Sequence, residues 1–122
     1  MVKRIVLFLM AVMLCSPFAF AELVQGSGRQ TVTTAGTAVA LSSTASSFTA
    51  LTICAETDNT GVIVVGNSDV VAVLASRKGI PLNAADCYTL DLNVGKLGNL
   101  NTVYIDSTVN TDGVTYHYQQ QV

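Results

Sequence analysis

Cys54 and Cys87 are a pair of cysteines, and the covalent reaction that such a pair can undergo is the formation of a disulfide bond. Outside the cytoplasm, an even pair of cysteines predicts a disulfide. Closing the loop between them would stabilise the fold by about 3 to 4 kcal/mol on the chain-entropy model. The alternative is two free thiols that are buried as small hydrophobic side chains. The export signal described below favours the disulfide, which requires the two strands to be neighbours.

His117 is the single histidine of the chain and lies between two tyrosines. A catalytic histidine needs a nucleophile or a carboxylate beside it, and the sequence contains no G-x-S-x-G elbow. We therefore expect an exposed or edge-strand histidine. The prediction is a protein that is not an enzyme, with no catalytic residue and no cofactor.

The stretch ETDNTG, residues 56–61, places oxygen ligands at alternate positions before a glycine. An EF-hand would also need a later bidentate glutamate, and no glutamate follows Glu56. The stretch is interpreted as an Asx-type turn, with a weak calcium site at Asp58 and Asn59 as the alternative. The two cysteines and the histidine lack the paired spacing of a zinc site, so no metal site is predicted.

Four aromatic side chains near the C-terminus form a candidate binding face: Tyr104, Tyr116, Tyr118 and His117. Tyrosines on one face of a sheet can bind a sugar or another protein. The alternative is that they cover the core at the edge of the fold. Arg77 and Lys78 are interpreted as a solvated turn, or as charges that keep a sheet edge from pairing with other chains.

The N-terminal segment decides the compartment in which these residues work. Lys3 and Arg4 precede an apolar run at 5–14, and small residues, Ala19 and Ala21, occupy the −3 and −1 positions of a cleavage site. This layout predicts a helical signal peptide over residues 1–21, cut after Ala21. The protein is then secreted, periplasmic or on the cell surface, and it touches a membrane only through the transient signal peptide.

Two other interpretations of the N-terminal segment are less favoured. An uncleaved anchor would need about 20 apolar residues, and the run is shorter and interrupted by Pro17. A lipoprotein with Cys15 at its N-terminus would need a small residue where Leu14 stands.

Removal of the signal peptide leaves four basic residues against eight acidic ones, a net charge of −4. No basic patch remains, so the charge excludes nucleic acid as a partner. The remaining residues, 22–122, are enough for one domain with one core.

Alternating apolar and polar residues predict strands throughout this domain rather than helices. The predicted strands are 29–34, 37–41, 48–56, 62–66, 70–75, 87–92, 102–107 and 114–119. Asp112-Gly113 is the strongest two-residue hairpin signal. Many short strands separated by turns predict an all-β fold, a single antiparallel β-sandwich or jelly-roll-like domain.

The alternation also predicts which side chains face the core. Leu51, Ile53 and Ala55 share one face of their strand, and Cys54 lies on the other. Cys87 likewise lies opposite the apolar face of its strand. A disulfide between the two is therefore expected on the outer face of a sheet.

Three stretches, LTICAETDNTGVIVVGNSDV, GIPLNAADCYTLDL and VYIDSTVNTDGVTYHY, are similar to small phage virion-associated β-sandwich proteins encoded among head and tail genes. The resemblance covers about residues 51–118 and consists mainly of turns and core positions. It implies a structural or decoration-type subunit, with no catalytic residues to carry over. Such proteins assemble in the cytoplasm without an export signal, so the signal peptide favours an exported relative.

These features together predict an exported, non-enzymatic structural or interaction module, a subunit or decoration of a larger extracellular or virion assembly. Its expected partners are proteins or further copies of itself. The alternative is a secreted module that binds a carbohydrate or another ligand. A fimbrial-type surface subunit is the second alternative, which the C-terminal YQQQV does not favour because it lacks an alternating aromatic ending.

Overall fold

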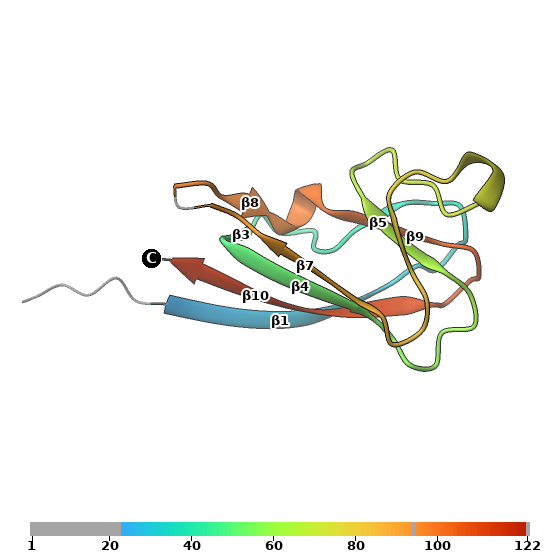
Figure 1. Ribbon diagram of the computed structural model, residues 1–122, viewed down its shortest axis with the longest axis horizontal. Helices are drawn as coiled ribbons and strands as arrows, with labels where there is room; N and C mark the ends of the chain where they lie inside the picture. Colours follow the sequence, from blue (N-terminus) through green and yellow to red (C-terminus); the bar gives the residue numbers. More distant parts are fainter. Residues whose placement is uncertain (1–22, 94, 122) are drawn as a thin grey trace, which may run out of the picture.

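The computed structural model of the chain describes residues 23–93 and 95–121 (Figure 1). The predicted signal peptide, with Ala19 and Ala21, lies outside these residues. Two four-stranded antiparallel sheets and one two-stranded sheet make up the described part. The expected all-β, antiparallel fold is thereby confirmed, and the described residues contain no α-helix.

The larger sheet, sheet A, has the strand order β1-β10-β4-β7. Its strands are β1 (Leu23–Thr31), β10 (Gly113–Gln121), β4 (Ala50–Ala55) and β7 (Cys87–Asp91). The longest two, β1 and β10, pair along their whole length. They run side by side from the two ends of the described chain (Figure 1).

The second sheet, sheet B, has the order β2-β9-β5-β6 and much shorter strands. They are β2 (Val39–Ala40), β9 (Tyr104–Ser107), β5 (Ile63–Gly66) and β6 (Ile80–Leu82). A small third sheet joins β3 (Ser47–Phe48) to β8 (Gly98–Asn99). Two single-turn 3₁₀ helices, η1 (Leu74–Ser76) and η2 (Leu100–Thr102), lie in the connections.

One hydrophobic core draws on both large sheets. Leu51 and Ile53 of β4 are buried together with Ile63 of β5 and Ile105 of β9. Alternation along β4 is strict, since its odd residues are buried and its even residues are half-buried. The predicted inward set of that strand is thus confirmed. Burial of each such side chain favours folding by about 1.5 to 3 kcal/mol.

The prediction of a strand over 70–75 is wrong. Only Val71 makes a bridge, to Lys78, and η1 follows at Leu74–Ser76. The reason is that the N–H of Ala72 donates to Asp106 Oδ2 at 2.9 Å instead of joining a sheet. The segment is extended enough to bury Ala72, but its backbone is bonded to a side chain.

The hairpin expected at Asp112-Gly113 is also wrong, because β9 belongs to sheet B and β10 to sheet A. The Asp112 carboxylate is buried and accepts hydrogen bonds from the N–H groups of Thr60 and Gly61, at 3.2 and 2.7 Å. These bonds tie the start of β10 to the loop that follows β4. The segment therefore crosses between the sheets instead of folding back on β9.

Within the described ranges, no helix has both the length and the apolar character needed to cross a membrane.

Candidate functional site

The outer face of sheet A, the face turned away from the core, is a regular array of polar side chains. Strand register places them in rows across the four strands: Arg29, Thr115, Cys54 and Cys87 in one, and Ser27, His117, Thr52 and Thr89 in the next. Small hydroxyl and amide groups dominate, and the single hydrogen bond between side chains within the second row joins Thr52 and Thr89 at 3.1 Å. The face is therefore polar rather than apolar.

The disulfide is present at the far side of this array. Cys54 and Cys87 are direct partners in the β4–β7 register, with their Cα atoms 4.0 Å apart and an S–S bond of 2.02 Å. Both expectations about it are confirmed: the two strands are neighbours and the bond lies on the outer face. An oxidised pair is consistent with an oxidising, extracellular environment.

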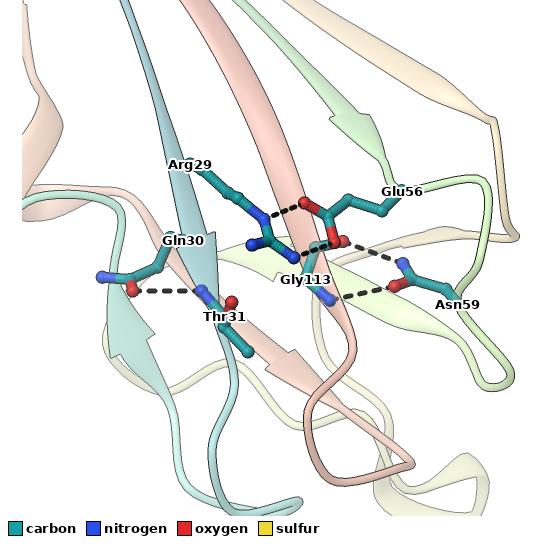
Figure 2. Close-up of polar contacts among 6 residues, drawn as sticks. All are labelled: Arg29, Gln30, Thr31, Glu56, Asn59 and Gly113. Carbon is teal, nitrogen blue, oxygen red and sulfur yellow. Dashed lines mark hydrogen bonds and ion pairs between the residues drawn. The ribbon is translucent and has the colours of Figure 1, made fainter.

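Arg29 and Glu56 form an ion pair at the end of the array (Figure 2). The guanidinium donates through Nε to one carboxylate oxygen and through Nη2 to the other, the latter at 2.9 Å. The Glu56 side chain is 13% exposed, whereas that of Arg29 is 63% exposed. The pair borders an open depression of about 590 Å³, which is also lined by Cys54, Asp58 and Thr115.

The ion pair shifts the pKa values of both partners in the directions that favour their charged forms. The hydrogen bond from Arg29 lowers the pKa of Glu56 below its ordinary value, against the opposing effect of burial. The same hydrogen bond raises the pKa of Arg29. Glu56 is thus held as a carboxylate, which leaves it no proton to donate in acid catalysis.

The side chain of Asn59, a residue of the predicted turn, makes two hydrogen bonds to the backbone of Gly113, the first residue of β10 (Figure 2). Its Nδ2 donates to the carbonyl of Gly113 at 2.8 Å, and its Oδ1 accepts from the N–H of Gly113 at 2.9 Å. Both polar atoms of the side chain are therefore committed to the backbone. Among the described residues, no group of three or more His, Cys, Asp or Glu side chains is placed to hold a metal ion.

The structure separates the residues of the predicted aromatic face. Tyr116 and Tyr118 lie on the inner face of β10 and contact the core, whereas His117 is exposed on the outer face. Tyr104 lies in sheet B, next to a second small cluster that contains Val64 and Val70. The alternation of β10 explains the split, because neighbouring residues of a strand point to opposite faces.

Tyr116 and Tyr118 have a structural partner that the sequence analysis missed. A Cβ atom added at Gly26 would overlap the ring of Tyr118, and one added at Gly28 would overlap the ring of Tyr116. Both glycines lie on β1, directly opposite these tyrosines. The rings thus fill the space that the glycines leave open, an arrangement known to support glycine in edge strands. Burial raises the pKa of Tyr116.

Tyr104 borders a second, neutral depression of about 360 Å³ on sheet B. The other lining residues carry amide or hydroxyl groups: Asn67, Ser68, Asn101 and Thr102. An aromatic ring beside several uncharged hydrogen-bonding groups can bind a sugar.

Sequence analysis also missed two buried carboxylates. Asp106 is 1% exposed, and its Oδ1 accepts from the N–H groups of Gly36 and Ser107 while its Oδ2 accepts from that of Ala72, at 2.8 to 2.9 Å. Asp112 binds the loop after β4 in the same way. Both carboxylates hold loops in place, and neither lines the two depressions described above. Nothing in the local sequence distinguishes them from exposed aspartates.

The outer edge of β1 is open. Both backbone groups of Val32 bond to the 111–112 segment, so alternation turns the even residues of β1 toward β10 and the odd residues toward the free edge. One odd residue is satisfied: the N–H of Thr31 donates to Gln30 Oε1 at 3.1 Å (Figure 2). Leu23, Gln25, Ser27 and Arg29 have no backbone partner on that side within the part of the chain that the structure describes.

No family model, curated protein or solved structure matches this chain.

Proposed function

We propose that this protein is an exported, non-enzymatic structural or interaction module. In this proposal, sheets A and B form a β-sandwich that serves as a rigid support, and sheet A docks to other protein chains. The module is secreted, periplasmic or on the cell surface, as a subunit or decoration of a larger assembly. The disulfide and the predicted signal peptide support export.

The open edge of β1 is the observation that carries this proposal. A nine-residue edge strand without proline offers a row of backbone donors and acceptors to another strand. Soluble proteins normally protect such an edge. An edge strand of sheet B shows how, since β6 has only three residues and contains Pro81. An unprotected edge of this length suits strand pairing with a protein partner.

The test is the native mass of the chain in the exported fraction. The undiluted fraction is chemically crosslinked first, so that weak complexes survive dilution, and size-exclusion chromatography with detection of this chain should then place it in a complex heavier than one chain. Non-reducing SDS electrophoresis of a sample that is not crosslinked is the matched control for disulfides between chains, because a complex held by strand pairing should separate into single chains there. Elution of the crosslinked fraction with the mass of a single chain would contradict the proposal.

A second candidate function is the binding of a neutral glycan in the depression beside Tyr104. The uncharged lining of that depression favours it, since sugars are held by stacking on aromatic rings and by amide and hydroxyl groups. A glycan screen should then show binding that is lost in Asn101→Ala and kept in Asn83→Ala, a control in an exposed turn. Absence of binding to every glycan would remove this candidate.

A further inference from the structure

We propose that two copies of this chain pair through the free edges of their β1 strands, antiparallel and about a twofold axis, so that sheet A continues from one copy into the other. The inference rests on the proposed function and names its partner. A twofold arrangement uses the same strand in both copies and closes on itself, whereas pairing of β1 with the opposite edge would continue without limit.

Hydrogen bonding fixes the register of this pair. The Thr31 N–H is already bonded to Gln30, so the open stretch of β1 runs from Leu23 to Arg29. An antiparallel pair that uses every open odd residue is centred on Gly26. It places Leu23 opposite Arg29 of the second copy, and Gln25 opposite Ser27 of the second copy.

Side chains are compatible with this register on both faces. On the outer face, Arg29 is the one charged residue of β1, and it meets an apolar side chain instead of the second Arg29. On the inner face, Val24 lies opposite Gly28 of the second copy, where the ring of Tyr116 fills the space of the missing side chain. At the centre Gly26 meets Gly26, and the ring of Tyr118 in each copy fills the space of the missing side chain.

Exposed apolar surface at the start of β1 supports the pairing. Leu23 is 53% exposed and Val24 is 38% exposed, although both stand in a regular strand. Pairing would cover both side chains in each copy. Two seven-residue segments bury little surface compared with a stable interface, so the pair is expected to be weak and reversible.

The proposal is tested by sedimentation equilibrium of the chain expressed from its full coding sequence and purified as the cell leaves it. The mass should rise from one chain to two with increasing concentration and stop there. Gln25→Pro removes an N–H that points to the free edge and none that bonds β10, so it should remain a single chain at every concentration. The matched control, Gln25→Ala, should dimerise like the original chain.

Charge variants keep the test decisive if the proline variant does not fold. In the proposed register, residues 25 and 27 of the two copies face each other. Gln25→Lys with Ser27→Lys should therefore give a single chain, and so should Gln25→Glu with Ser27→Glu. An equal mixture of the two variants should form a mixed dimer.

Three results would overturn the proposal: one-chain mass of the original protein at every concentration, a series of ever larger species, or a dimer that Gln25→Pro leaves unchanged. The proposed function fails separately. A purified chain that stays single while the exported chain is found in a heavier complex refutes only the β1 pairing. A single chain in both samples refutes both.

Discussion

Backbone N–H groups that lie outside the strand pairing differ between two regions of the described chain. Near the buried carboxylates they are hydrogen-bonded to a side chain, whereas along the outer edge of β1 most of them are not. Asp106 alone takes up three N–H groups from three parts of the chain, and Asp112 takes up two more. Along β1, the N–H groups of the odd residues from Leu23 to Arg29 have no acceptor among residues 23–93 and 95–121. Side chains therefore satisfy these five backbone N–H groups, whereas along the β1 edge a side chain satisfies only that of Thr31 among the described contacts.

The open edge of β1 therefore does not result from a general lack of side-chain acceptors in this fold. Where β1 ends, Gln30 bonds the last free N–H and also donates through Nε2 to the carbonyl of Ala40 at 2.6 Å. Gln30 accepts from no other N–H group of the β1 edge in the described residues. The open stretch beside Gln30 supports the proposal that β1 pairs with a partner chain.

The disulfide should have the largest effect on stability. Replacing Cys54 and Cys87 together by serine should lower the free energy of unfolding by about 3 to 4 kcal/mol, because the unfolded chain regains the entropy of an open loop. Urea unfolding measures the change. The odd-numbered amides of β1 are already expected to exchange fast, so their exchange should stay as it was. Unchanged stability would show that the bond does not constrain the unfolded chain.

Asp106→Ala should come next, with a loss on the order of 3 kcal/mol, since it leaves buried N–H groups of Ala72 and Ser107 without an acceptor. Asp91→Ala, at an exposed position of β7, is the matched control and should change little. Equal effects of the two substitutions in urea unfolding would show that the Asp106 carboxylate does not stabilise the fold.

Asn59→Ala should cost about 2 kcal/mol, because it removes two hydrogen bonds to Gly113 at the start of β10. The same unfolding measurement applies, with Asn67→Ala in an exposed turn as the control. We also expect faster amide exchange at Gly113 in the variant. A stability equal to that of the control would contradict the role assigned to Asn59.

Glu56→Gln should have the smallest effect, one that depends on pH. The folded-state pKa of Glu56 is lowered by Arg29, so the ion pair adds stability above the unfolded-state pKa and loses it as the pH falls through the folded-state pKa. The variant should therefore melt below the original chain at pH 7, and the two melting temperatures should converge as the pH falls through the lowered pKa of Glu56. A constant difference across this range would contradict the assignment.

Periodicity predicted the part of the fold that burial controls. The inward residues of β4, the outward disulfide and the all-β antiparallel class follow from alternation, because a strand with one buried face must alternate. The segments that failed, 70–75 and Asp112-Gly113, are those whose backbone is bonded to a side chain distant in the sequence. Ala72 is 34 residues from Asp106, and no local pattern records such a pairing.

The candidate site was only partly predictable for the same reason. Cys54 and Cys87 could be matched because an even pair has one partner choice. The tyrosines could be placed on one face of β10, but their partners, Gly26 and Gly28, lie at the other end of the chain. The open edge depends on strand order, which a sequence without repeats does not specify.

Amide hydrogen exchange by NMR in dilute protein measures directly whether the edge of β1 is open. We expect the N–H groups of Gln25, Ser27 and Arg29 to exchange almost as fast as in an unfolded chain, and those of Gly26, Gly28 and Ala72 to be strongly protected. Slow exchange at Gln25 and Ser27 in protein too dilute to associate would contradict this expectation, because the edge of β1 would then already be covered within one chain.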